Sequence, residues 1–117
     1  MALCVLVVED EPTIRSLAVD ILSDAGFKTV EANDAAQALD VLKNPEHDID
    51  VLFTDVRMPG SMNGLQLARV AQTKRPKLRV IVTSGYYESG ELPKDANFIG
   101  KPWSASDLIS KIRRAAA

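Results

Sequence analysis

The chain has 117 residues, of which 46% are hydrophobic and 26% charged, as expected for one globular domain. Its 14 basic and 16 acidic residues give a net charge of −2, which excludes the strongly basic surface of an autonomous nucleic-acid binder. The single cysteine, Cys4, excludes an internal disulfide and favours a reducing, cytoplasmic location. The longest apolar run, residues 3–8, is too short to span a membrane. The N-terminus lacks a basic stretch and reaches Glu9-Asp10 at once, so we expect no signal peptide. We therefore expect a single domain over residues 1–117 that acts without a membrane.

Short apolar runs alternate with amphipathic segments along the chain. Residues 3–8 predict a strand buried on both faces. Pro12 then suits the first turn of a helix, whose apolar stripe begins at Ile14 and which ends at Gly26. The later elements are a strand at 28–32, a helix capped by Asn33 or Asp34 and stopped by Asn44-Pro45, a strand at 49–54, a helix from 65 to before Pro76, strands at 78–83 and 97–100, and a last helix striped by Leu108, Ile109 and Ile112. This alternation predicts an α/β fold with a parallel sheet covered on both faces.

The start of the last helix carries two local signals. Ser104 and Asp107 have the spacing of a capping box, with Asp in place of the usual Glu. Trp103 and Leu108 occupy the two positions of a hydrophobic staple around that cap. We therefore interpret Trp103 first as a structural residue and only second as a contact for a partner.

Polar residues follow four of the five predicted strands. Glu9-Asp10 ends the first strand, Asp55 the third, Ser84 the fourth and Lys101 the fifth. Because ligands bind at the carboxyl edge of open α/β sheets, where the strand order reverses, these positions form one candidate site.

A cluster of this composition needs a proton or a cation. Two carboxylates about 4 Å apart repel by about 4 kcal/mol at an effective dielectric constant near 20, which corresponds to roughly three pKa units. Carboxylates and a backbone carbonyl are hard oxygen ligands suited to Mg²⁺. Such an ion would attract a phosphoryl group, which Lys101 could bind as a point charge.

Each of these residues has a simpler interpretation when taken alone. Glu9-Asp10 could cap the first helix, and Asp55 could be a local cap. Ser84-Gly85 and Lys101-Pro102 could be ordinary turns. Four independent coincidences at four strand ends explain the pattern poorly, so we favour the joint interpretation.

At these residues the chain resembles the receiver domain of bacterial two-component response regulators. The matching segments are residues 7–12 (VVEDEP), 54–59 (TDVRMP) with the later Gly64, 82–85 (VTSG) and 98–102 (FIGKP), and the resemblance covers essentially the whole chain. It implies a doubly wound five-stranded parallel sheet of order 2-1-3-4-5, the flavodoxin-like or CheY-like arrangement.

The resemblance also implies a phosphorylation-dependent switch. Asp55 would accept a phosphoryl group from a histidine kinase, a phosphotransfer protein or a small phosphodonor, and a downstream protein would bind the altered surface. Mg²⁺ would be held by Asp10, Asp55 and the backbone carbonyl of Arg57, with Glu9 binding through water. The roles implied for the remaining residues are charge neutralisation by Lys101, a hydroxyl for the attached phosphoryl group from Ser84, and the switch aromatic for Phe98. Such a domain would phosphorylate and dephosphorylate itself without being a turnover enzyme.

The sequence departs from the family pattern at several positions. The loop 60–63 carries an extra residue before Gly64, Ser84 replaces the commoner threonine, and Phe98 lacks the hydroxyl of the frequent tyrosine. The segment 85–100 is shorter than usual and contains Gly90 and Pro93, so we expect the family's fourth helix to be short or absent.

Two other functions compete with the switch. A pseudo-receiver would be an interaction module that is never phosphorylated, but the complete set of acidic, hydroxyl and lysine residues argues against it. A different α/β activity, such as an FMN carrier or a phosphatase, is disfavoured because a flavin phosphate would need a Ser/Thr/Gly-rich loop where residues 9–12 read EDEP.

Overall fold

The computed structural model describes residues 2–85 and 96–117. Five parallel strands form one sheet of order β2-β1-β3-β4-β5. The strands are β1 (Cys4–Val8), β2 (Lys28–Ala32), β3 (Val51–Asp55), β4 (Arg79–Ser84) and β5 (Ala96–Gly100). The predicted sheet and its order are therefore confirmed, and the reversal of strand order places β1 beside β3.

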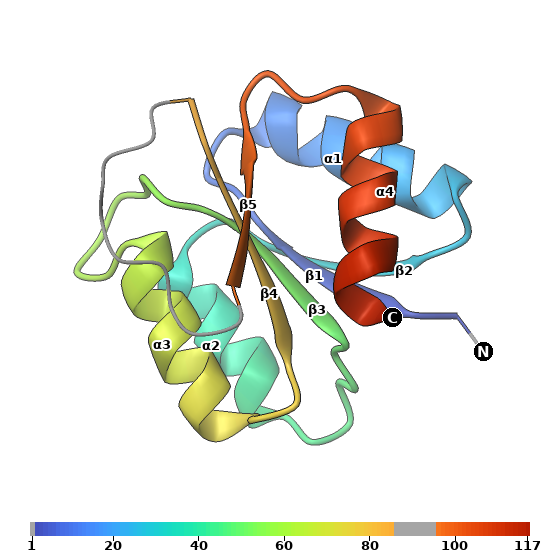
Figure 1. Cartoon of the computed structure of the whole chain (residues 1–117). Helices are drawn as coiled ribbons and strands as arrows, with labels where there is room; N and C mark the ends of the chain where they lie inside the picture. Colours follow the sequence, from blue (N-terminus) through green and yellow to red (C-terminus); the bar gives the residue numbers. More distant parts are fainter. Residues whose placement is uncertain (1, 86–95) are drawn as a thin grey trace.

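Two layers of helices cover the sheet (Figure 1). The helices are α1 (Pro12–Asp24), α2 (Ala35–Lys43), α3 (Gly64–Lys74) and α4 (Ala105–Ala116). Helices α2 and α3 pack on one face and α1 and α4 on the other, since their apolar stripes belong to two separate core clusters. The expected doubly wound architecture is thus present.

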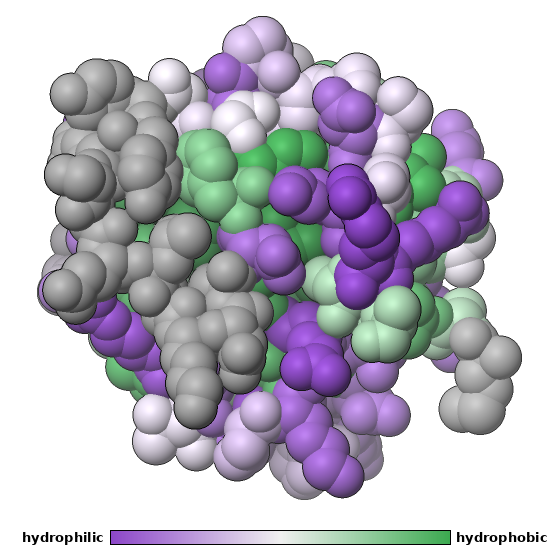
Figure 2. All heavy atoms as spheres, viewed as in Figure 1, coloured by the Kyte–Doolittle hydropathy of each residue, from purple (hydrophilic) through white to green (hydrophobic). Residues whose placement is uncertain are grey.

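The strands supply both core clusters because successive side chains point to opposite faces of a sheet. In β1, Leu6 and Val8 face α2 and α3, whereas Val5 and Val7 face α1 and α4. Figure 2 shows a largely hydrophilic outer surface on the viewed face, with hydrophobic residues visible mainly towards its middle. No helix within the described ranges is long and apolar enough to cross a membrane.

The helix ends confirm several local predictions and correct one. Gly26 follows α1 with a φ of 95°, a conformation that glycine adopts without strain. Asp34 caps α2 by accepting from the Gln37 backbone N–H, and Ser104 caps α4 by accepting from that of Asp107. The N-cap of α1 is Glu11, so the alternative that Glu9-Asp10 merely caps this helix is wrong.

The third helix has a cap that the sequence interpretation did not include. Asn63 and Gln66 form a full capping box, each side chain accepting the other residue's backbone N–H at 2.9 Å. The helix therefore begins at Gly64 and not at residue 65, and Asp55 is the last residue of β3 and not a cap. The predicted shortening or loss of a helix between β4 and β5 falls on residues 86–95, which lie outside the described residues.

Candidate functional site

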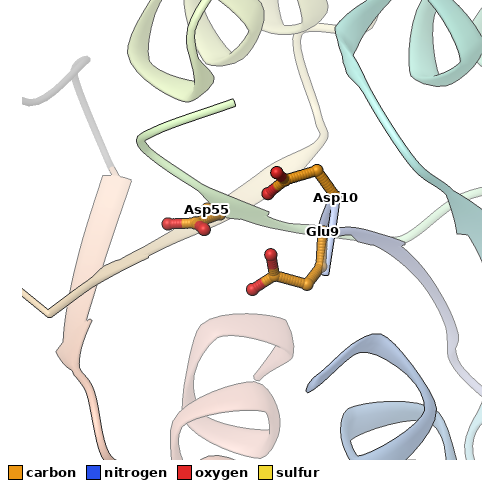
Figure 3. A group of neighbouring side chains, drawn as sticks. All are labelled: Glu9, Asp10 and Asp55. Carbon is orange, nitrogen blue, oxygen red and sulfur yellow. The ribbon is translucent and has the colours of Figure 1, made fainter. Parts of the chain in front are cut away.

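Three carboxylates meet at the carboxyl edge of the sheet. Glu9 and Asp10 follow β1, Asp55 ends the neighbouring β3, and one oxygen of each lies within 4.8 Å of the others (Figure 3). Glu9 is 5% exposed and Asp55 8% exposed, whereas Asp10 is open to solvent. The parallel pairing of β1 with β3 creates this cluster from residues that are distant in sequence.

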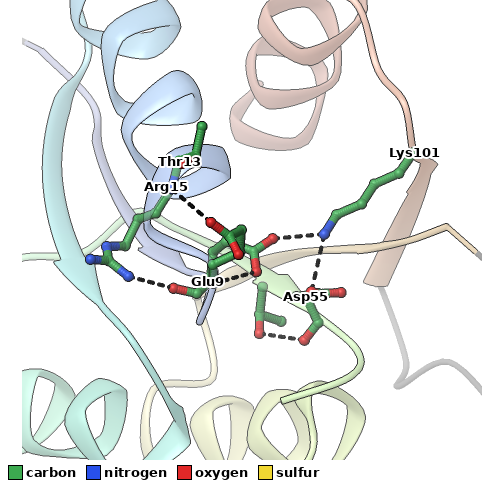
Figure 4. A network of polar contacts seen from close by, with 7 residues as sticks. Glu9, Thr13, Arg15, Asp55 and Lys101 are labelled. Carbon is green, nitrogen blue, oxygen red and sulfur yellow. Dashed lines mark hydrogen bonds and ion pairs between the residues drawn. The ribbon is translucent and has the colours of Figure 1, made fainter. Parts of the chain in front are cut away.

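Lys101 supplies the counter-charge. Its Nζ lies 2.7 Å from Glu9 Oε1 and 3.1 Å from Asp55 Oδ2 (Figure 4). Burial alone lowers the pKa of Lys101, but hydrogen bonds and charge from Glu9 and Asp55 outweigh it, so the net pKa is raised. The ammonium is therefore charged at neutral pH and leaves three carboxylates and one cation, a net charge of −2 with all three ionised.

Asp10 is the carboxylate that Lys101 does not contact in this arrangement. Loss of hydration beside its neighbours, followed by a hydrogen bond with Glu9 and the Glu9 charge, raises the pKa of Asp10. Its ionised form is thus less favourable in the folded protein than in the unfolded chain. An additional cation at this edge would relieve that cost, and the carboxylate oxygens are the ligand type that Mg²⁺ prefers.

The backbone around Asp55 is held tightly. The Asp55 carbonyl accepts a 2.9 Å hydrogen bond from the Thr54 hydroxyl, and Val56 N–H donates to the Thr83 carbonyl at 3.0 Å. Gly64 N–H donates to the Val56 carbonyl at 2.8 Å. A Cβ on Gly64 would lie only 1.8 Å from the Asp55 carbonyl oxygen, so glycine is required for α3 to start this close to β3.

The remaining predicted residues are Ser84, Arg57 and Phe98, which lie at different distances along the chain from the strand ends that form the cluster. Ser84 is buried at the end of β4, next to the end of β3. Arg57 is exposed two residues beyond Asp55, in the connection to α3. Phe98 is half-buried in β5 opposite Val82, two positions before the strand ends. The structure brings Glu9, Asp10, Asp55 and Lys101 together. The roles of Ser84, Arg57 and Phe98 stay predictions.

Arg15 belongs to the surroundings of the site, although the sequence interpretation did not include it. This α1 residue donates from Nη1 to the Glu9 backbone carbonyl at 2.8 Å (Figure 4). Its place outside the apolar stripe of the helix was the only sequence signal, and that signal fits any solvated arginine.

Concavity by itself does not mark the site. A hollow of about 600 Å³ lies at the opposite edge of the sheet, where its lining includes Asp50, Arg75 and Arg79. Asp50 there already accepts a hydrogen bond from the Cys4 backbone N–H at 2.8 Å. The clustered carboxylates at the carboxyl edge are the stronger indication, because the negative charge that Lys101 leaves unbalanced favours a bound cation.

The fold and this cluster together define a doubly wound parallel α/β protein with an acidic site at the switch point of its sheet. The profile of the response regulator receiver domain matches residues 5–113. The chain therefore belongs to the receiver domain family, whose members are phosphorylation-dependent signalling switches.

Individual relatives agree with this assignment. The response regulator receiver protein CpdR of Brucella abortus is 30% identical over 94% of this chain and 93% of its own length. The sensor kinase CckA of the same organism is 33% identical over 93% of this chain, but the chain spans only 12% of that kinase. Among solved structures, the response regulator TrrA of Thermotoga maritima in complex with Mg²⁺-BeF has a TM-score of 0.86 and 26% identity, covering 97% of this chain and 98% of TrrA.

Proposed function

We propose that Asp55 is the phosphoacceptor of this receiver domain and that its phosphorylation requires Mg²⁺. The observation that carries the proposal is the convergence of Glu9, Asp10 and Asp55, with the Lys101 ammonium between two of them. The complex of TrrA with Mg²⁺-BeF supports the choice of Mg²⁺.

The donor set fits Mg²⁺. Three carboxylates from two adjacent strand ends offer hard oxygens in a group small enough to surround one ion. Asp10, Asp55 and the Arg57 carbonyl would hold the ion, with Glu9 binding through water. When bound, Mg²⁺ would neutralise negative charge on the oxygens of the transferring phosphoryl group.

The chain's own residues carry the covalent step. A carboxylate oxygen of Asp55 would attack the phosphorus of a phosphohistidine, so that the new O–P bond forms as the P–N bond breaks. The electron pair of the P–N bond would stay with the imidazole nitrogen, which takes up a proton from solvent. Lys101 contacts Asp55 at 3.1 Å and is placed to stabilise charge on the incoming phosphoryl oxygens. Ser84, on the adjacent strand end, would donate its hydroxyl to a phosphoryl oxygen once the group is attached.

The partners follow from this chemistry. The phosphoryl donor would be a histidine kinase, a phosphotransfer protein or a small phosphodonor. A downstream protein would bind the phosphorylated domain, and all of these would be in the cytoplasm. Phe98 would couple the site to the surface by packing, since it has no hydroxyl. The domain would act as a self-modifying phosphoacceptor and not as a turnover enzyme, without contacting nucleic acid directly.

Labelling with acetyl phosphate tests the proposal. The protein is incubated with acetyl phosphate and Mg²⁺, and intact mass spectrometry should detect one added phosphoryl group. Asp55→Asn should abolish the adduct, whereas Asp40→Asn, an exposed α2 carboxylate, should retain it. A folded, Mg²⁺-binding protein that takes up no phosphoryl group would instead be a pseudo-receiver.

Removal of Lys101 tests its assigned role separately. Lys101→Ala removes the cation that contacts Glu9 and Asp55, so Mg²⁺ should bind at least as tightly as before. The response to phosphorylation, measured as a change in Trp103 fluorescence, should be impaired. A collapse of Mg²⁺ binding would show that Lys101 organises the carboxylates instead.

A further inference from the structure

Arg15 joins the ends of two neighbouring strands next to the acidic cluster. Its Nη1 donates to the Glu9 carbonyl at 2.8 Å after β1 (Figure 4). Its Nε lies 3.2 Å from Glu31 Oε1 in β2. The Arg15 side chain is 20% exposed, so the contact with Glu9 is partly shielded from water. Two N–H groups of one rigid, planar guanidinium therefore serve two strands at once.

The peptide group that Arg15 contacts is the one that leads into Asp10. The Glu9 carbonyl and the Asp10 N–H belong to a single planar unit, so fixing one fixes the direction of the other. Glu9 is held on its other side by its backbone N–H, which donates to the Ala32 carbonyl at 3.1 Å. Its side chain is held too, since Oε2 accepts from the Glu11 N–H at 3.1 Å. Arg15 completes the set that fixes Glu9 and Asp10.

We propose that Arg15 is a positioning residue for the acidic site. It orients the Glu9–Asp10 peptide, and through it aims the two carboxylates at the space beside Asp55. Glu31 holds the guanidinium in place and offsets its charge. This inference rests on the proposed function, because it concerns how well the carboxylates can hold Mg²⁺.

A positioning role and a purely electrostatic role for Arg15 predict opposite changes in Mg²⁺ affinity when Arg15 is removed. If Arg15 acted only through its charge, its removal would make the site more negative and tighten Mg²⁺ binding. If it orients the carboxylates, its removal weakens Mg²⁺ binding despite the lost positive charge. A lysine at this position retains the charge but lacks the two-pronged planar geometry, so it should not restore the site.

The experiment is a calorimetric Mg²⁺ titration of four proteins: the wild type, Arg15→Ala, Arg15→Lys and Arg113→Ala. The last is the matched control, since Arg113 is an exposed α4 arginine whose guanidinium lies 5.9 Å from the centre of the Phe27 ring. We expect both Arg15 variants to bind Mg²⁺ about tenfold more weakly, the low end of the effect of residues that orient metal ligands. Arg113→Ala should bind as the wild type does.

Two further readouts complete the test. Circular dichroism and thermal unfolding without Mg²⁺ show whether each variant is folded, so that affinities are compared only between folded proteins. Labelling by acetyl phosphate should slow in parallel with the loss of Mg²⁺ affinity. If Arg15→Ala misfolds, Arg15→Lys, which retains the charge and the aliphatic stem, decides the question.

The possible results distinguish a failure of the Arg15 positioning role from a failure of the proposed phosphoacceptor function. A wild type that binds no Mg²⁺ or accepts no phosphoryl group contradicts the proposed function. A competent wild type together with an Arg15→Ala variant that binds Mg²⁺ equally or more tightly overturns the positioning role. An Arg15→Lys variant indistinguishable from the wild type overturns it as well, because charge alone would then suffice.

Discussion

Replacing Gly64 with alanine tests how the phosphoacceptor strand is held. Gly64 begins α3, and an added Cβ would lie 1.8 Å from the Asp55 carbonyl oxygen and 2.7 Å from its carbon. Real Cβ contacts are essentially never shorter than 3.0 Å, so helix and strand must separate by at least 1.2 Å, the difference between 3.0 and 1.8 Å. Both partners are backbone, so no side-chain rotation can relieve the overlap.

Two opposing contributions set the change in the free energy of unfolding that Gly64→Ala causes. Glycine to alanine in a helix is ordinarily favourable by up to about 1 kcal/mol. Overpacking costs about 1–3 kcal/mol, and the upper end applies here because rigid backbone must move. We therefore expect a net loss of about 2 kcal/mol, which lowers the unfolding midpoint by about 10 °C in a domain of this size.

The site should suffer more than the fold. Moving the Asp55 backbone by about 1 Å can cost about 100-fold in rate, because reacting groups must be aligned closely. Urea unfolding followed by circular dichroism measures the first effect, and acetyl phosphate labelling followed by mass spectrometry measures the second. Gly100→Ala is the control, since its Cβ would make an ordinary 3.7 Å contact with Phe98. A Gly64→Ala protein as stable and as reactive as the wild type would refute the reasoning.

Three further predictions concern other residues. Arg75 donates to the carbonyl of Leu42 at 2.8 Å, in the last turn of α2, and to that of Asn44 at 3.0 Å, just after the helix. Arg75→Ala should therefore lower the free energy of unfolding by about 2 kcal/mol in urea titrations, and an unchanged midpoint would contradict this. Burial, reinforced by the Asp50 charge, raises the pKa of the Cys4 thiol above its ordinary 9.0. The folded state therefore retains the proton that the unfolded chain loses, and the free energy of unfolding should fall as the pH rises above 9.0. Thiolate absorbance should accordingly appear at higher pH in native than in denatured protein. Asp10→Asn removes a carboxylate whose pKa is raised, so without Mg²⁺ the thermal unfolding midpoint of the variant at neutral pH should exceed that of the wild type. Adding Mg²⁺ should no longer raise the midpoint of the variant. A midpoint that still rises with Mg²⁺ would show that Asp10 is not a ligand.

Local sequence patterns were sufficient for the architecture. The continuous apolar strands, the helical stripe starting at Ile14 and the turn at Gly26 each depend on residues close together in the chain. Polar residues at strand ends were equally visible, because a strand buried on both faces leaves few other places for a charge. These patterns predicted the sheet, and the matching motifs identified the family.

Local caps were harder to assign because several acidic residues compete for one position. Glu9, Asp10 and Glu11 are consecutive, and each can cap a helix that starts near Pro12. The structure selects Glu11, which leaves Glu9 turned to Lys101 and Asp10 exposed near Asp55. That choice depends on the end of β1, which is set by its neighbours in the sheet.

By itself, the sequence determined the alternating fold, the family, and the edge of the sheet at which the acidic residues gather. Only the tertiary structure decided which of them Lys101 contacts, since it lies 92 residues from Glu9 and 46 from Asp55. The same holds for the Arg15 contact with a backbone carbonyl and for the close approach of Gly64 to Asp55. The physical reason is that periodicity reports which face of an element is buried, whereas these contacts depend on where separate elements meet.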